Sequence, residues 1–195
     1  MNSYVFRLEK GKYAEYKCEI LNTMLYKFPD IYLGGSYALN SLGLIDREIY
    51  DFDFCLSHAL KQPVIDFVTE LIKSKNNSKG FNLLGIFSTE PKVMLKKADE
   101  DDTNPELHIH EYIGDTKIGV FFYNDSGEKT YDVWDELLGR VVRVSSPEKI
   151  IKAKEMYVKD RDSLYGDVSK HIDDLDIIKT KMKDFKAKLF FGNLL

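Results

Sequence analysis

The sequence predicts an α/β (α+β) protein in which helices flank a mixed β-sheet and further helices follow at the C-terminal end. Short segments rich in β-branched and aromatic residues alternate with segments of helical periodicity up to residue 146. From residue 147 onward, the apolar residues recur at helical spacing. We therefore expect an α/β core over residues 1–146 and a helical part over residues 147–195 that packs on this core.

The composition is that of a folded protein and not of a disordered chain. The 195 residues are 44% hydrophobic and 13% aromatic, and the formal net charge of −4 does not indicate a general nucleic-acid binder. Cys18 and Cys55 form neither a disulfide framework nor a metal-binding cluster. No apolar run approaches the roughly 20 residues of a membrane span, and no signal-peptide core is visible. We expect a cytoplasmic protein without a membrane partner.

The first part of the chain has residue patterns that predict two strands and two long helices. Apolar residues at helical spacing predict a helix over 12–27, which Pro29 ends, and the apolar run 31–33 predicts a strand. A second strand is expected over 49–56. Pro63 lies at the start of the next helix. The apolar residues of that helix are Val64, Phe67, Val68, Leu71 and Ile72.

The second part of the chain predicts a series of short strands and then two helices. The strands are expected over 83–87, 93–97, 107–113, 117–123 and 138–144. A tight turn at 114–115 joins two of these strands. A proline-led helix is expected over 147–162, and a second helix over 167–188 completes the chain.

A glycine pair and a serine follow the first of these strands, at Gly34, Gly35 and Ser36. Glycine allows positive φ and lets the backbone approach a ligand closely. Ser36 is a suitable N-cap for a helix that begins at Tyr37, and the amides at a helix N-terminus suit a phosphate group. A Gly-Gly-Ser segment by itself is most often a turn.

Asp51 and Asp53 alternate with Phe52 and Phe54 in the second strand. Residues two apart in a strand point to the same face, so the carboxylates would lie about 6–7 Å apart along the backbone and repel each other without a cation between them. Mg²⁺ takes oxygen ligands together with water and phosphate, so we expect one or two Mg²⁺ ions here, with Mn²⁺ as a substitute. An isolated Asp-x-Asp is usually a half-exposed edge strand. Asp51 and Asp53, together with the Gly34–Ser36 segment that precedes them, predict metal-dependent phosphoryl transfer.

Two polar residues interrupt the apolar faces of the C-terminal helices. Lys154 lies within an apolar face, where a lysine usually extends to the surface but could also neutralise a phosphate group. In the next helix, the helical period places His171 within the apolar face and Asp174 at its edge. The basic run from Lys179 to Lys188 is expected to be solvated helix surface, with contact to RNA or nucleotide phosphate as the alternative.

The order of these motifs resembles the signature of the DNA polymerase beta-like nucleotidyltransferase superfamily. The matching residues are Leu33, Gly34, Gly35, Ser36, Asp51 and Asp53. Residues 145–178, which contain Lys154 and Asp174, are similar in outline to AbiEii-type toxins of bacterial toxin–antitoxin systems and to related minimal nucleotidyltransferases. The resemblance implies a nucleotidyltransferase-like sheet over residues 1–146.

The same resemblance implies transfer of a nucleoside monophosphate from a nucleoside triphosphate, such as ATP, to a hydroxyl acceptor, with release of pyrophosphate. Asp51 and Asp53 would be catalytic metal ligands, and Lys154 would be catalytic and contact the phosphates. The implied nucleotide-binding residues are Gly34, Gly35, Ser36, Lys154 and Asp174. An RNA end is the first choice of acceptor, a protein side chain or a small molecule is the alternative, and an antitoxin-like protein is an implied partner.

One position departs from the superfamily's pattern. Gly119 stands on the strand 117–123 where a third carboxylate is expected, and Glu111 or Asp115 is an alternative source of that carboxylate. Loss of a general base costs about 10²–10⁴-fold in rate. The sequence therefore leaves a second hypothesis open, in which a catalytically decayed nucleotidyltransferase fold binds nucleotides or serves as a structural or interaction module.

Overall fold

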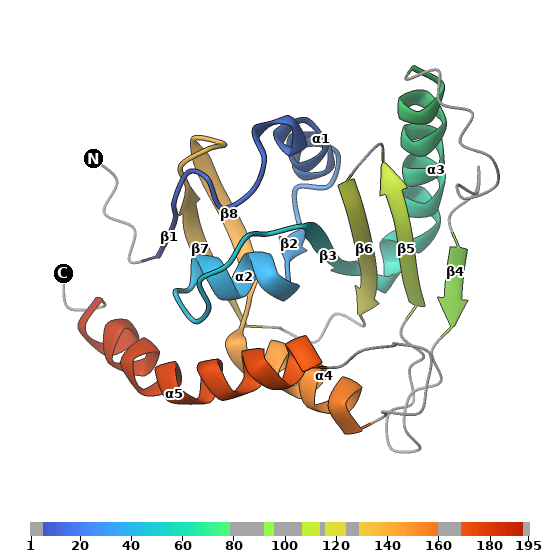
Figure 1. Cartoon of the computed structure of the whole chain (residues 1–195). Helices are drawn as coiled ribbons and strands as arrows, with labels where there is room; N and C mark the ends of the chain where they lie inside the picture. The colour runs from blue at the N-terminus through green and yellow to red at the C-terminus, as the bar shows by residue number, and fades with distance from the viewer. Residues whose placement is uncertain are drawn as a thin grey trace. The chain divides into compact units, whose positions relative to one another are not determined.

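A computed structural model describes residues 6–78, 92–95, 107–113, 116–123, 129–159 and 169–192. The chain forms two compact units, each assembled from segments that are distant in the sequence. Unit 1 comprises residues 1–15, 34–49 and 129–195, and unit 2 comprises residues 16–33 and 50–128. Strands and helices occur in both units, and parallel and antiparallel pairing occur together (Figure 1). The predicted α/β (α+β) class with a mixed sheet and flanking helices is confirmed.

The strands of unit 2 lie in the order β2-β3-β6-β5-β4. β3 and β6 are parallel, whereas the pairs β2–β3, β6–β5 and β5–β4 are antiparallel. β3 therefore lies inside this sheet, between β2 and β6. The bounds are β2 Tyr32–Leu33, β3 Asp51–Ser57, β4 Lys92–Leu95, β5 Leu107–Ile113 and β6 Thr116–Tyr123.

The helical segments that lie wholly within the described part of unit 2 are α1 (Cys18–Lys27), the short 3-10 helix η2 (His58–Leu60) and α3 (Lys61–Ser78). Phe28, at the C-terminal end of α1, packs edge-on against Phe67 of α3, with ring centroids 5.5 Å apart. α3 also packs against β5. Aromatic contacts thus join the two longer helices of the unit.

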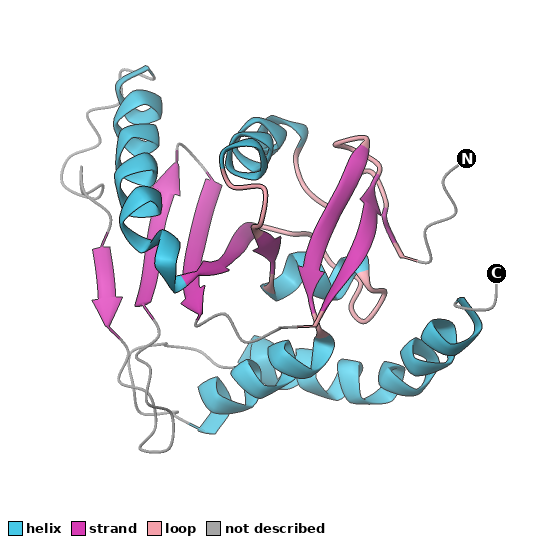
Figure 2. Ribbon diagram, turned by 180° about the vertical axis from the view of Figure 1, so that it is seen from behind, coloured by secondary structure: helices cyan, strands magenta, loops and turns pink. Residues whose placement is uncertain are grey.

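The described part of unit 1 contains a short sheet and three α-helices. β1 (Arg7–Leu8) is parallel to β7 (Thr130–Asp135), which forms an antiparallel hairpin with β8 (Arg140–Ser145) (Figure 2). Gly139 has a φ of +63° in the turn of this hairpin, a conformation that glycine adopts without strain. The helices are α2 Gly35–Ser41, α4 Pro147–Lys159 and α5 Ser169–Gly192.

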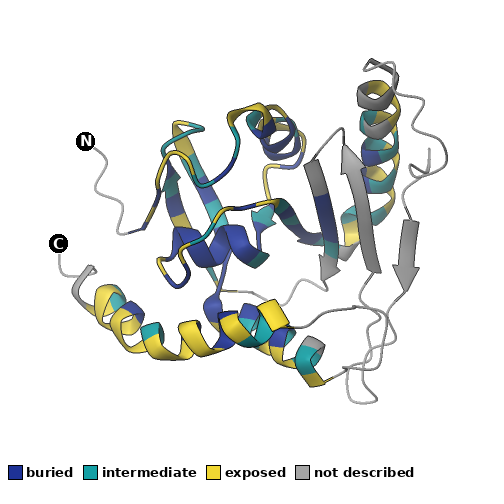
Figure 3. Cartoon of the chain, in the orientation of Figure 1, coloured by how far each residue is buried: buried dark blue, intermediate teal, exposed yellow. Residues whose placement is uncertain are grey.

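A buried carboxylate fixes the interior of unit 1. Asp135 is 0% exposed, and its Oδ2 accepts hydrogen bonds from the hydroxyls of Tyr13 (2.8 Å) and Tyr37 (2.6 Å). Its Oδ1 accepts two more from the backbone amides of Leu137 and Leu138, each at 2.9 Å. Asp135 therefore joins the N-terminal segment, α2 and the β7–β8 hairpin. All residues of α2 after Gly35 are buried, and Figure 3 shows most of this helix in the buried colour.

Several predicted elements agree with the structure, and others differ in their bounds. The strand over 107–113 is confirmed as β5, and the neighbouring strand begins one residue earlier than predicted, at Thr116. The helix predicted over 12–27 is wrong at its start, because residues 15–17 form the 3-10 turn η1 (Glu15–Lys17) and the α-helix begins at Cys18. β1 and β7 were not predicted. The strand predicted over 83–87 and the turn at 114–115 lie outside the described residues.

The predicted boundary between residues 146 and 147 falls inside unit 1, which contains β8 as well as α4 and α5. Within the described ranges, no helix is both long enough and apolar enough to cross a membrane.

Candidate functional site

The first candidate residues are the two aspartates of β3. Asp51 and Asp53 are half-buried, while Phe52 and Phe54, which alternate with them, are 0% exposed. The strand therefore places both carboxylates on one face and both phenyl rings on the buried face, as the alternation predicts. No group of three or more His, Cys, Asp or Glu residues suited to a metal occurs among the described residues.

Gly119 lies directly beside Asp53, because β3 and β6 pair these two residues in register. A Cβ atom on residue 119 would lie 2.7 Å from Asp53 Oδ1 and 2.9 Å from Cε2 of Phe121. Both separations are shorter than van der Waals contact, so any side chain here, including the aspartate that the superfamily pattern expects, would displace the Asp53 carboxylate. Gly119 thus has a steric role that the sequence did not reveal.

The two alternative sources of a third carboxylate stay predictions, because the structure describes neither side chain. Glu111 on β5 is in register with Ile118, which in turn is in register with Phe52. The backbone of Glu111 is therefore aligned with Phe52 and Ile118 and not with Asp53 and Gly119. Asp115 lies outside the described residues.

Lys17 holds the chain immediately before the aspartates. The residue is 5% exposed, and its Nζ donates a hydrogen bond of 2.7 Å to the backbone carbonyl of Tyr50. The same ammonium lies 5.8 Å from the centroid of the Tyr50 ring. Because Tyr50 precedes Asp51, Lys17 helps to fix where β3 begins. Its place in a predicted amphipathic helix gave no sign of this contact.

The Gly34–Ser36 segment begins α2 in unit 1. Gly34 is the N-cap and Gly35 has a φ of +51°, so the expectation that Ser36 caps the helix is wrong. Ser36 lies in the first turn instead and is 6% exposed. Its carbonyl accepts a 2.9 Å hydrogen bond from Nδ2 of Asn40. The positive φ at Gly35 explains why glycine is required one residue earlier than the predicted cap.

Lys154 of α4 and Asp174 of α5 form a buried ion pair. Nζ of Lys154 donates to Oδ2 of Asp174 at 2.8 Å, and the two residues are 5% and 4% exposed. Burial lowers the pKa of Lys154 from its ordinary value, whereas Asp174 opposes that shift. The structure therefore brings together two residues that the sequence placed on separate helices, and Asp174 is more deeply buried than its predicted edge position indicated.

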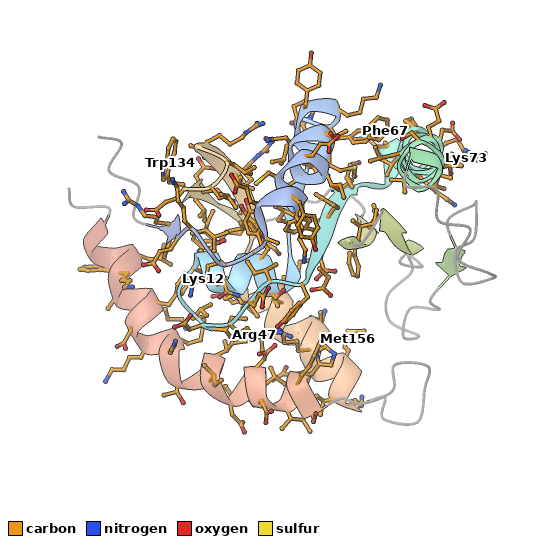
Figure 4. All side chains as sticks on the ribbon, turned by 45° about the horizontal axis from the view of Figure 1, so that its top comes forward. Lys12, Arg47, Phe67, Lys73, Trp134 and Met156 are labelled. Carbon is orange, nitrogen blue, oxygen red and sulfur yellow. The ribbon has the colours of Figure 1, made fainter. Side chains whose placement is uncertain are left out.

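Arg47 completes this ion pair and was missed by the sequence analysis. Its Nη2 donates to the same Oδ2 of Asp174 at 3.1 Å, and its backbone amide donates to Oδ1 of Asn40, also at 3.1 Å. Figure 4 shows the Arg47 side chain extending from the segment that follows α2. A lone arginine in a loop has no periodicity to mark it, and its partner is 127 residues away in the sequence.

His171 contacts Lys154 from α5, with 3.3 Å between Nδ1 and Nζ. The pKa of His171 is lowered to about 4, first by burial and then by the positive charge of Lys154. The imidazole is therefore neutral at pH 7, and its Nδ1 can accept a hydrogen bond from the Lys154 ammonium.

The candidate residues thus fall into two groups. Gly34, Gly35, Ser36, Lys154 and Asp174 belong to unit 1, and Asp51 and Asp53 belong to unit 2. The chain crosses from unit 2 to unit 1 between Leu33 and Gly34, and returns between Ile49 and Tyr50.

Comparison with known proteins adds no relative. No model of a protein family, no curated protein and no solved structure matches the chain. Functional interpretation therefore depends on the chemistry of the residues described above.

Proposed function

We propose that the protein is a metal-dependent nucleotidyltransferase of the DNA polymerase beta-like superfamily, nearest in outline to AbiEii-type toxins and minimal nucleotidyltransferases. It transfers a nucleoside monophosphate from a nucleoside triphosphate to a hydroxyl, and it releases pyrophosphate and the hydroxyl proton. The observation that supports this most strongly is the half-buried pair Asp51 and Asp53, which lies on one face of β3 with Gly119 alongside.

The donor set of this face fits Mg²⁺. Asp51 and Asp53 offer carboxylate oxygens, which are the ligands that Mg²⁺ prefers, and Gly119 leaves the space that the Asp53 carboxylate occupies. A site with two protein carboxylates leaves coordination positions for water and for phosphate oxygens, as is usual for Mg²⁺ bound with a nucleotide. Bound there, Mg²⁺ or Mn²⁺ would withdraw negative charge from the reacting phosphate.

Lys154 is the proposed counter-charge for the phosphates. Its ammonium is buried, and the hydrogen bond to Asp174 favours the charged form. A cation held where water is excluded stabilises developing negative charge more strongly than a cation in water does. Asp174 would therefore act on the nucleotide through Lys154, as the residue that keeps the ammonium charged and in position.

The Gly34–Ser36 segment is proposed to approach the phosphates through its backbone. Residues other than glycine seldom adopt the φ of +51° that Gly35 has, so the shape of the backbone here depends on glycine. Asn40 stabilises this shape from within α2 through its bond to the Ser36 carbonyl.

An RNA end is the acceptor that we propose first, and a protein hydroxyl or a small molecule is the alternative. The exposed lysines of α5 support the first choice, because cationic side chains attract the RNA backbone. These lysines are Lys179, Lys183, Lys186 and Lys188. We place the reaction in the cytoplasm, with an antitoxin-like protein as a proposed partner.

A second candidate function is nucleotide binding without turnover. The packing of Gly119 against Asp53 favours it, because that packing leaves no room for a third carboxylate at position 119. In this case the fold would act as a nucleotide-dependent interaction module.

Transfer of label from nucleotide to acceptor distinguishes the two functions. The protein is incubated with each radiolabelled triphosphate, Mg²⁺ or Mn²⁺, and total RNA or total protein. We expect a labelled acceptor with the wild type and none with Asp51→Asn or Asp53→Asn. Asp132→Asn is the matched control, because Asp132 is an exposed aspartate on another strand. Nucleotide binding with no transfer under either metal would favour the second function.

A further inference from the structure

Two cations converge on one carboxylate oxygen inside unit 1. Oδ2 of Asp174 accepts hydrogen bonds from Nζ of Lys154 at 2.8 Å and from Nη2 of Arg47 at 3.1 Å. His171, the fourth member of the cluster, has a pKa of about 4 and is uncharged at pH 7. The cluster therefore has two positive charges and one negative charge. An excess of positive charge in a partly buried cluster is unfavourable unless an anion balances it.

Arg47 has donors that the structure leaves available. A guanidinium has five N–H donors, and the hydrogen bond to Asp174 uses Nη2. Nε of Arg47 is buried, and it has no hydrogen-bond partner in the described part of the chain. The side chain as a whole is 33% exposed, so Arg47 is partly accessible to solvent. Arg47 is thus partly exposed, and one buried donor of its guanidinium is unsatisfied.

Hydrogen bonds also fix the position of Arg47 relative to the glycine segment. Asn40 of α2 accepts from the Arg47 amide through Oδ1 and donates to the Ser36 carbonyl through Nδ2. Asn40 is 6% exposed, so solvent does not compete strongly for these bonds. A continuous set of polar contacts therefore runs from Ser36 through Asn40, Arg47 and Asp174 to Lys154.

We propose that Arg47, together with Lys154, binds a phosphate group of a polyphosphate ligand. A guanidinium matches two oxygens of one phosphate with two parallel donors, and an ammonium adds a compact charge. Asp174 orients both cations before the ligand arrives. This inference rests on the proposed function, for which it names Arg47 as a phosphate-binding residue.

Binding of inorganic tripolyphosphate in the absence of divalent metal tests the inference. Without metal, the measurement does not depend on Asp51 and Asp53. Isothermal titration calorimetry compares the wild type with Arg47→Met and Arg47→Lys, and adenosine serves as a ligand that lacks phosphate. Arg7→Met is the matched control, because Arg7 Nη1 also forms one carboxylate ion pair at 3.1 Å, with Glu136.

We expect Arg47→Met to weaken tripolyphosphate binding by about tenfold or more, since a charge-assisted contact is lost. Arg47→Lys should weaken it less, because the charge remains while the paired donors are lost. Arg7→Met should bind as the wild type does, and adenosine should show no dependence on Arg47. Arg47→Lys also guards against misfolding, because it keeps a cation near Asp174.

Equal affinity in the wild type, Arg47→Met and Arg47→Lys would overturn the inference, and so would an absence of tripolyphosphate binding by the wild type. Binding that depends on Arg47, in a protein that transfers no nucleotide, would support the inference and reject the proposed activity. Nucleotide transfer by the wild type, together with an unchanged KM for the triphosphate in Arg47→Met, would support the proposed activity and reject the inference about Arg47.

Discussion

The carboxylate of Asp53 occupies the space that a side chain of residue 119 would enter. The two residues are in register on β3 and β6, and Asp53 Oδ1 lies 2.7 Å from where a Cβ of residue 119 would be. In the sequence, Gly119 stands where a third carboxylate was expected. In the structure, the absence of a side chain at Gly119 leaves room for the Asp53 carboxylate.

Gly119→Ala should displace the Asp53 carboxylate and weaken metal binding. The added methyl group would be too close to both Asp53 and Phe121, and overpacking of this kind costs about 1–3 kcal/mol. We expect Mn²⁺ affinity, measured by electron paramagnetic resonance, to fall by about tenfold, which corresponds to about 1.4 kcal/mol.

Gly11→Ala is the control for a general loss of stability. Gly11 has a φ of +87°, and a Cβ there would meet no atom within 4 Å, so alanine strains the backbone without contact to Asp51 or Asp53. It should lower stability and leave Mn²⁺ affinity unchanged. Equal Mn²⁺ affinity in Gly119→Ala and the wild type would show that Asp53 does not bind the ion.

Asp174→Asn should destabilise the protein more than Lys154→Met does. Removal of Asp174 leaves the buried Lys154 and the partly buried Arg47 without their shared carboxylate, and the loss of one partner of a buried pair costs about 3–5 kcal/mol. Removal of Lys154 leaves Asp174 paired with Arg47, so the cost should be smaller. Urea denaturation of both single variants and the double variant measures the coupling. Strictly additive effects would contradict a direct interaction.

His171 should make stability depend on pH in the mildly acidic range. Its pKa falls from 6.5 to about 4 on folding, because burial and then Lys154 disfavour the charged form. Between these values the unfolded chain binds more protons, so stability should decrease as the pH falls from 6.5 towards 4. In His171→Gln this part of the decrease should disappear. Urea denaturation at pH 7 and pH 5 provides the comparison, and identical pH dependence in the two proteins would refute the assignment.

Much of the fold follows from local patterns in the sequence. β3 and β5 have the alternation and residue types of strands, and the apolar stripe of α5 repeats at helical spacing. β1 is only two residues long and exists through its pairing with β7, so no local pattern marks it. β7 does have a local pattern, because the apolar residues Tyr131 and Val133 alternate with polar Thr130 and Asp132, and both apolar residues are buried.

The candidate site was predictable in its residue types but not in its contacts. Asp51 and Asp53 were identified by alternation, and Lys154 was identified as a polar residue on an apolar face. The importance of Arg47 depends on a contact across 127 residues, and that of Gly119 depends on register with Asp53. Neither relationship has a local signal in the sequence, because both arise from how distant segments pair.

Asp135 should be among the residues most important for stability. Its two oxygens accept four hydrogen bonds while the residue is 0% exposed, and Asp135→Asn replaces one acceptor with a donor that faces other donors. We expect a loss of about 3 kcal/mol, compared with about 1 kcal/mol for Tyr37→Phe, which removes a single bond. Thermal and urea denaturation of both variants would measure the difference, and equal losses would contradict a central role for this carboxylate.

The position of the transferred label tests the proposed activity most directly. The protein is incubated with Mg²⁺, RNA and a nucleoside triphosphate labelled at either the α- or the γ-phosphate. Nucleotidyl transfer predicts label on the acceptor from the α-position alone, pyrophosphate as the second product, and loss of both in Asp53→Asn but not in Asp132→Asn. Label from the γ-position, or equal labelling by Asp53→Asn and the wild type, would contradict a nucleotidyltransferase that depends on the β3 aspartates.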